Sequence, residues 1–332
     1  MKVVRGFVDV ELCASDTVVS IGNFDGVHIG HQAVIGSAVQ AAVGADLMSV
    51  VCTFDPHTRL FLDPGSPPRL LETLEQRLAS IETLGVDVVV VIPFSKAVAE
   101  FPRGEFITEF LRGTLGAVEL HVSEDFTFGA GGAGNVEYLK RVAYENNLEV
   151  RVVSPIMADG NPVSSTCIRD AVAEGRVVDA ARFLGRPFSL VGKVVGGSGR
   201  GRVLDAPTAN LAVENAFVPG NGVYVTEARL DGVSYQAVTN VGVRPTFETG
   251  GKLSVETHLL DREMSLYGEL LELAFLQKLR GEIEFGSADA LATQIAEDVR
   301  QAANYVPIDH DDVRYTADVS SGVQARKDSG PS

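Results

Sequence analysis

The sequence predicts an α/β fold: a doubly wound parallel sheet, followed by a small antiparallel β-barrel with a C-terminal helix. The chain has 332 residues, about twice the ~150 of a typical domain. Its first half alternates β-branched runs with longer helical patterns, whereas short strand-like runs without helices fill its second half. We expect domains at 1–185 and 186–306 and a disordered tail at 307–332.

Five runs in the first half are expected to form the parallel sheet: TVVSI (17–21), LMSVVCTF (47–54), VDVVVVI (86–92), AVELHV (117–122) and LEVRVV (148–153). Helical patterns connect them, beginning near His28 and near Glu72 and covering 105–115 and 136–146. The run at 86–92 is apolar at nearly every position, as in a strand covered on both faces. Because ligands bind such sheets at the carboxyl ends of their strands, we expect a site in the first strand-to-helix loops.

Five runs in the second half are expected to form the barrel: SLVGKVVGGSGRG (189–201), GVYVTEARL (222–230), VSYQAVTNVG (233–242), LSVETHLL (253–260) and LLELAFLQ (270–277). Gly, Pro, Asp and Asn separate these runs, which is typical of antiparallel strands joined by turns. The pattern at 288–303 predicts the closing helix. The change from alternating strands and helices to strands alone predicts a hinge near 175–188.

The composition excludes several classes of protein. A net charge of −16 disfavours nucleic-acid binding, so any anionic ligand must be held locally by backbone N–H groups, a few basic side chains or a metal. Three widely spaced cysteines disfavour a disulfide framework and a zinc site. Since no apolar run approaches the ~20 residues of a membrane helix and no signal peptide is evident, we expect a cytoplasmic protein without membrane partners.

The first chemical motif is GNFDGVHIGH (22–31), directly after a predicted strand. Gly22 and Gly26 allow the backbone to approach a ligand, and the N–H groups at the start of the next helix can bind phosphate. His28 and His31 are three residues apart, so both imidazoles project from one face and can donate hydrogen bonds to a phosphoryl group. Two surface histidines are the alternative, which the preceding strand and Gly-rich turn disfavour.

The second motif is VSSTCIRD (163–170). Ser164, Ser165 or Thr166 can simply cap a helix. Arg169 would then lie in the first turn, where it opposes the helix dipole, and this placement indicates an anion such as the β- and γ-phosphates of a nucleotide. Three phenylalanines that follow predicted strands can stack on a flat ring or belong to the core, and both interpretations stay open: Phe54, Phe126 and Phe128.

The second half carries the motif GGSGRGRVLDAPTANL (196–211). Its glycines, Gly199 and Gly201 among them, allow backbone N–H groups to curl around phosphate oxygens. Thr208 and Asn210 lie on one side of an extended chain and can supply oxygen ligands to Mg²⁺. Glu256 lies in the middle of a predicted strand; it is either solvated or, if it faces a ligand, a general base for a hydroxyl that attacks a γ-phosphate.

The motifs GNFDGVHIGH, TFDPH (53–57), EDFTFG (124–129) and SSTCIR (164–169) resemble the adenylyltransferase module of bacterial bifunctional riboflavin kinase/FAD synthetases, a nucleotidyltransferase sheet of the HxGH type. The resemblance implies that His28 and His31 stabilise the α-phosphate of ATP. The remaining ATP-site residues are then Gly22, Phe24, Asp25, Gly26, Ser164, Thr166 and Arg169. Asp125 and the three phenylalanines would lie in the flavin pocket.

The second half is similar to riboflavin kinases through PTANL (207–211), GVY (222–224), NVGVRPTF (240–247), VETHLLD (255–261), LYG (266–268), LR (279–280) and Phe285–Ser287. The two resemblances together cover about residues 15–305. They imply a flavin-binding barrel in which Thr208 and Asn210 meet Mg²⁺ and ATP, beside Gly199 and Gly201, and Glu256 is the base. We therefore expect ATP-dependent phosphorylation of riboflavin to FMN and adenylyl transfer to FMN, giving FAD and pyrophosphate.

Three departures from the family pattern qualify this expectation. Thr58 replaces a usual Pro and is expected to change only loop stiffness, and AGGAGN (130–135) lacks basic residues that members often carry there. Asp205-Ala206 replaces Gly-Phe beside the triphosphate, where an extra charge at ~6 Å and a dielectric of ~20 costs on the order of 2–3 kcal/mol. A monofunctional FAD synthetase with an impaired barrel is therefore an alternative, a non-catalytic flavin sensor is another, and the oligomeric state, a homo-oligomer included, stays open.

Overall fold

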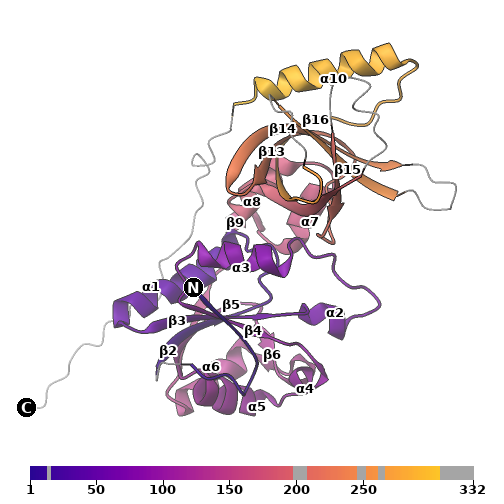
Figure 1. The fold of residues 1–332 in the computed structure, drawn as a ribbon. Helices are drawn as coiled ribbons and strands as arrows, with labels where there is room; N and C mark the ends of the chain where they lie inside the picture. The colour runs from indigo at the N-terminus through magenta and orange to yellow at the C-terminus, as the bar shows by residue number, and fades with distance from the viewer. Residues whose placement is uncertain (13–15, 197–207, 245–251, 261–265, 307–332) are drawn as a thin grey trace, which may run out of the picture.

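The computed structural model describes residues 1–12, 16–196, 208–244, 252–260 and 266–306. The α/β half and the barrel half lie end to end, with the C-terminal helix on the far side of the barrel (Figure 1). The predicted tail, the glycines Gly199 and Gly201, and Asp205-Ala206 fall outside the described residues.

A six-stranded parallel sheet forms the first half, in the order β1-β4-β3-β2-β5-β8. Its strands are β1 (Lys2–Arg5), β2 (Thr17–Ile21), β3 (Met48–Phe54), β4 (Val88–Ile92), β5 (Ala117–Ser123) and β8 (Glu149–Val153). The five predicted strands are confirmed, and β1 is an addition at the edge. Chain order reverses at β2, between β3 and β5, so ligand-binding loops are expected where β2 and β5 end.

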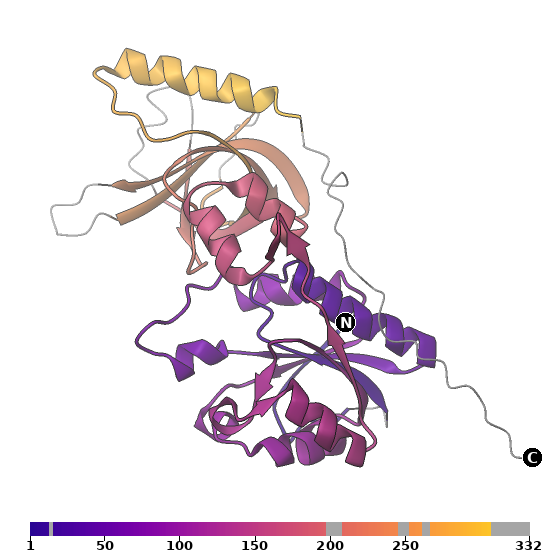
Figure 2. The same cartoon turned by 180° about the vertical axis from the view of Figure 1, so that it is seen from behind.

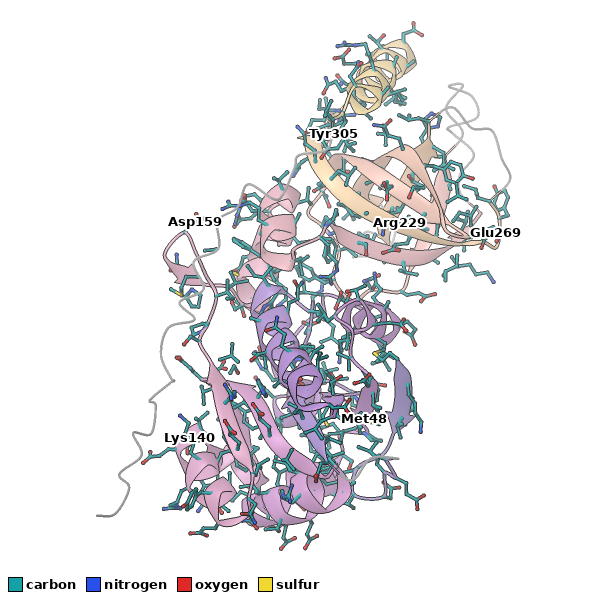
Figure 3. The ribbon with its side chains drawn as sticks, turned by 90° about the vertical axis from the view of Figure 1, so that its left-hand side faces the viewer. Met48, Lys140, Asp159, Arg229, Glu269 and Tyr305 are labelled. Atoms are coloured by element: carbon teal, nitrogen blue, oxygen red, sulfur yellow. The ribbon has the colours of Figure 1, made fainter. Side chains whose placement is uncertain are left out.

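Helices cover both faces of this sheet (Figures 1 and 3). α1 (Ile29–Ala45) and α3 (Leu74–Glu82) pack on one face; α6 (Val136–Glu145) and the π-helix η1 (Phe106–Thr114), which follows α5 (Arg103–Glu105), pack on the other. The remaining short elements of this half are α2 (Thr58–Leu62), α4 (Lys96–Ala99), β6 (Thr127–Phe128), η2 (Ala130–Gly132), β7 (Gly134–Asn135), β9 (Met157–Ala158) and β10 (Asn161–Pro162).

The second half is a closed antiparallel barrel, as the sequence predicts; its strand order is β11-β12-β15-β14-β13-β16, and β12 is an addition to the five predicted runs. Its strands are β11 (Phe188–Val195), β12 (Ala209–Val213), β13 (Gly222–Leu230), β14 (Val233–Arg244), β15 (Lys252–Leu259) and β16 (Leu270–Arg280). The predicted C-terminal helix is α10 (Ala288–Ala303), which lies across the outside of the barrel (Figure 2). Arg280 holds it there through Asp298, with nitrogen-to-oxygen distances of 2.7 to 3.2 Å.

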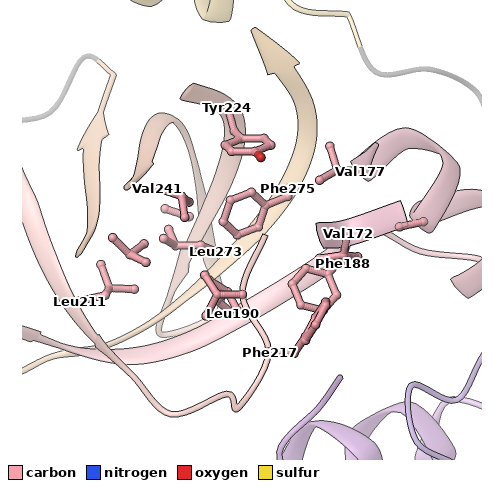
Figure 4. Packing of buried hydrophobic residues seen from close by; sticks show 14 of the residues in the cluster. Val172, Val177, Phe188, Leu190, Leu211, Phe217, Tyr224, Val241, Leu273 and Phe275 are labelled. Carbon is pink, nitrogen blue, oxygen red and sulfur yellow. The ribbon is translucent and has the colours of Figure 1, made fainter. Parts of the chain in front are cut away.

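Two helices connect the halves: α7 (Ser165–Ala173) and α8 (Val177–Leu184). Most of the segment expected as a hinge is therefore helical. Both helices join the hydrophobic cluster of the barrel interior, where Val177 lies on the side of the Tyr224 and Phe275 rings and Val172 lies beside Phe188 (Figure 4). No helix within the described ranges is long and apolar enough to cross a membrane.

Candidate active sites

The loop between β2 and α1 has an unusual backbone. Phe24 and Val27 have positive φ values of 50° and 36°, a region that costs a non-glycine residue about 1–3 kcal/mol. Gly26 has a φ of 88°, and a Cβ placed on it would lie 2.8 Å from Leu71 Cδ1. The surroundings of this loop must therefore hold it in place.

The loop delivers two imidazoles to one place. His28 is the N-cap of α1, and its Nδ1 accepts a hydrogen bond from the backbone N–H of His31 at 3.3 Å. The two rings stack with centroids 3.5 Å apart, and Phe24 contacts His31 edge-on at 5.3 Å. A Cβ on Gly30 would lie 3.1 Å from His28 Cε1, so a side chain at position 30 would push against the His28 ring. The predicted common face of His28 and His31 is confirmed.

Both imidazoles are neutral at pH 7. Burial lowers the pKa of His28 to about 4, with a further contribution from the charge of Arg186. Burial also lowers the pKa of His31 well below its ordinary value, and that of His57 to about 4. Neutral rings can donate hydrogen bonds to a phosphoryl oxygen but carry no charge of their own. The positive side-chain charges that act on His28 come from Arg186 and Arg169.

The start of α7 meets this loop through Asp25. Ser165 Oγ donates to the Asp25 carbonyl at 2.9 Å, and the Asp25 carboxylate accepts from Arg169 Nη1 at 2.9 Å, 144 positions away, and from the Leu71 N–H at 2.9 Å. Burial raises the pKa of Asp25, which is 2% exposed, while these donors lower it. Asp25 therefore fixes Arg169 beside the histidines, where the guanidinium lowers the pKa of His28.

The hydroxyl residues of α7 divide into two roles. Ser164 caps the helix by accepting from the Cys167 N–H at 3.3 Å, as the simpler interpretation of the sequence expects. Thr166 is exposed beside Arg169, with its Oγ1 3.4 Å from Nη2. The helix N-terminus, Thr166 and Arg169 thus lie together at the edge of the loop.

The predicted flavin residues lie at the end of β3 and just after β5. Phe54 is half-buried and contacts Phe94 at 5.6 Å; Phe94 in turn contacts Phe61 at 5.8 Å. These two additional rings were not singled out in the sequence, although Phe94 follows a strand as Phe54 does.

On the β5 side, Asp125 is exposed and accepts from Ser123 Oγ at 2.5 Å. Phe126 is half-buried and stacks on Phe128 at 5.5 Å. Phe128 is 6% exposed and packs on Phe106 at 5.0 Å, so its ring is chiefly core.

Thr58 does more than change loop stiffness, and that expectation is wrong. Its N–H donates to Asn23 Oδ1 at 3.1 Å, and its Oγ1 accepts from Asn23 Nδ2 at 3.0 Å. Proline has neither group. The pair ties the start of α2 to the loop that carries His28.

The kinase candidates lie on neighbouring barrel strands. Asn210 of β12 is opposite Glu256 of β15, and Glu256 is opposite Asn240 of β14. Ser254 Oγ donates to Glu256 Oε1 at 3.0 Å. Glu256 is half-buried on the outer face of β15, whereas Thr257 is buried inside, where its hydroxyl accepts from Thr239 at 2.9 Å. Side chains on β15 therefore alternate between the two faces. Asn240, the first residue of the motif NVGVRPTF, is an additional candidate because the strand register places it opposite Glu256.

These oxygen-bearing groups suit a magnesium ion shared with ATP. Thr208 is exposed just before β12, and Asn210 follows two residues later. Within the described ranges no cluster of three or more His, Cys, Asp or Glu side chains could hold a metal. Because Mg²⁺ is bound by one or two protein groups plus substrate phosphates, such a cluster is not needed.

A parallel sheet with paired imidazoles at its switch point, followed by a barrel with Asn and Glu on adjacent strands, defines a two-domain nucleotide-dependent transferase. A family model for FAD synthetase matches residues 11–167, and one for riboflavin kinase matches 184–306. Bifunctional riboflavin kinase/FMN adenylyltransferases of Pseudomonas fluorescens and Escherichia coli K12 are 38% and 34% identical, over 91% and 92% of this chain and 97% and 98% of theirs. The chain belongs to this bifunctional family.

A solved structure shares the fold over nearly the whole chain. It is the crystal structure titled macrolide-efflux protein from Streptococcus pneumoniae, with a TM-score of 0.85, 30% identity, and coverage of 92% of this chain and 100% of that one. The presence of both family domains favours a bifunctional enzyme over the monofunctional synthetase and the non-catalytic sensor.

Gly30→Ala is expected to slow FAD formation about 10- to 100-fold, because the new methyl group displaces the His28 ring. Gly36→Ala is the matched control, since a Cβ at that position of the same helix has open space. Turnover of FMN to FAD is measured by chromatography of the flavins. Equal activities of the two variants would contradict the proposed need for a small residue between the histidines.

Acid should destabilise the fold through His28. The unfolded chain binds a proton near pH 6.5, but folded His28 does so only near pH 4, so stability is lost as pH falls through this window. At pH 5 the loss is about 2 kcal/mol for one such histidine. The free energy of unfolding is measured with urea at pH 7 and at pH 5. The decrease between the two pH values should be smaller for His28→Gln than for the unmodified protein, and equal decreases would refute the lowered pKa of His28.

Proposed function

We propose that residues 1–185 transfer AMP from ATP to FMN and that residues 186–306 phosphorylate riboflavin. The observation that carries the first half is the meeting of His28, His31 and Arg169 at the switch point of the sheet. The second half is supported by the row of Asn210, Glu256 and Asn240 on the outside of the barrel.

In adenylyl transfer, a phosphate oxygen of FMN attacks the α-phosphorus of ATP. The bond from that phosphorus to the bridging oxygen breaks, and pyrophosphate leaves. We assign to His28 and His31 hydrogen bonds to the α-phosphate, which strengthen as charge develops on its oxygens. Arg169, Thr166 and the α7 N-terminus, capped by Ser164, hold the β- and γ-phosphates.

The loop residues have supporting roles in this ATP site. Gly22 and Gly26 allow close approach of the backbone, and Phe24 packs against His31. Asp25 acts through Arg169, which it orients. On the flavin side, we assign ring contacts to Phe54 and Phe126, backed by Phe128, and Asp125 lies at the rim.

In the kinase reaction, Glu256 accepts the proton of the riboflavin hydroxyl that attacks the γ-phosphate. Thr208 and Asn210 would hold Mg²⁺, which neutralises charge on the phosphates when bound. The proposed partners are ATP, riboflavin and FMN, without nucleic acid or membrane, and the proposed location is the cytoplasm. The acidic net charge of −16 is in keeping with this assignment.

His28→Ala should reduce FAD formation at least 100-fold and leave FMN formation unchanged, because the barrel residues are untouched. Glu256→Gln should do the reverse, since it removes the base and keeps the shape. Each purified variant is incubated with ATP, Mg²⁺ and either FMN or riboflavin, and the flavins are separated. Loss of both activities in both folded variants would refute the division of labour.

A further inference from the structure

Arg186 connects α8 to the first barrel strand, yet its side chain points back to the adenylyl loop. Its guanidinium donates to the carbonyls of Gly26 at 2.9 Å, of Leu184 at 3.1 Å and of Val27 at 3.4 Å, and it also pairs with Glu72. The residues of the loop that it contacts are the two that directly precede His28.

The partner of Arg186 is a buried carboxylate. Glu72 is 8% exposed, and one of its oxygens accepts from Ser80 Oγ at 3.2 Å as well as from Arg186. Burial raises the pKa of Glu72, and the charge of Arg186 lowers it. A hydrophobic pair of similar size is often at least as stabilising as a buried ion pair, so stability alone does not account for this one.

The contacts of Arg186 with backbone carbonyls suggest what the Arg186–Glu72 pair does besides stabilising the fold. Val27 has a φ of 36°, and such a conformation persists only where the surroundings hold it. Its carbonyl receives a second donor, Gln32 Nε2 at 2.8 Å, and the same amide also donates to the Leu184 carbonyl at 2.8 Å. The loop is therefore attached at Gly26 and Val27 to the segment that enters the barrel.

We propose that Arg186 is a positioning residue for adenylyl transfer: it fixes the Gly26 and Val27 carbonyls and thereby the place of His28 at the start of α1. This role rests on the function proposed above for His28. Arg186 belongs to the stretch that matches riboflavin kinase, 184–306, and lies beyond the FAD synthetase match, 11–167. The kinase half thus supplies a residue that completes the FAD-forming site.

A second arginine also connects the halves, through contacts that lie away from the loop, so it separates positioning from simple attachment. Arg69 Nε donates to the Ala216 carbonyl at 3.0 Å, and its guanidinium lies 5.1 Å from the centre of the Phe217 ring. Arg69 thus joins the two halves, as Arg186 does, without reaching Gly26 or Val27. Arg69→Met is therefore a matched control for Arg186→Met.

The test uses four full-length variants: Arg186→Met, Arg186→Lys, Arg69→Met and the double variant Arg186→Met/Glu72→Leu. Arg186→Met alone leaves the buried Glu72 carboxylate unpaired and can unfold the protein. The double variant removes both charges and is therefore expected to keep the fold in that case. Steady-state kinetics are measured for FMN to FAD and for riboflavin to FMN, and urea unfolding reports stability.

We expect Arg186→Met and the double variant to lower kcat for FAD formation about 10- to 100-fold, with KM for ATP and FMN within about 2-fold. Arg186→Lys should recover only part of kcat, because one ammonium cannot reproduce the planar fork. FMN formation should be unchanged in all four, and Arg69→Met should keep normal FAD formation even if it unfolds at lower urea.

Three results would overturn the proposal. The first is a double variant whose kcat for FAD formation is within about 2-fold of the unmodified protein. The second is an equal loss of FAD formation in Arg69→Met, and the third is a parallel loss of FMN formation in folded Arg186 variants. A different result would count against His28 alone. If the Arg186 variants behave as expected but His28→Ala still forms FAD, the role proposed for His28 is wrong, and the positioning role of Arg186 has to be explained through another group of the loop.

Discussion

The buried carboxylate of Asp25 is the contact on which the adenylyl site depends. A charge that is 2% exposed must be paired, and Asp25 accepts from Arg169 of α7 and from the Leu71 N–H. Three segments far apart in the sequence are thereby joined at one residue. The strained backbone around Phe24 and Val27 is held by these bonds, which places His28 and His31 where β2 ends.

Function and packing divide this chain at different places. The FAD synthetase match runs to residue 167, but the hydrophobic cluster of the barrel already includes Leu71 and Val163 from within that match, together with Ile168 and Val172 of α7. The helix that carries Arg169 is therefore packed against the barrel. Movement of the barrel relative to the sheet would move this arginine as well, because a packed helix shifts as a unit.

Local pattern was enough to predict most of the fold and part of the site. Apolar β-branched runs located the sheet, whereas β1 was missed because Lys2–Arg5 is short and mostly exposed at the edge. Arg169 was singled out because a basic residue in the first turn of a helix is unfavourable without a nearby anion, and the structure places the Asp25 carboxylate beside it. Arg186 and Asn240 could not be found in this way, because one acquires its role from contacts about 160 positions away and the other from strand register.

Because the net charge is −16, positive charge that attracts the anionic ATP has to be concentrated at the binding sites, and the two halves differ in how they provide it. Around the histidine loop, three arginines are gathered: Arg169, Arg186 and the buried Arg77, which donates to the Phe54 carbonyl at 2.9 Å. Their charges help to keep the imidazoles neutral, so under the proposed function these rings would donate hydrogen bonds while the arginines supply the positive potential. On the barrel, Thr208, Asn210 and Glu256 bear oxygen atoms, and under the function proposed above a Mg²⁺ ion would bring positive charge to them.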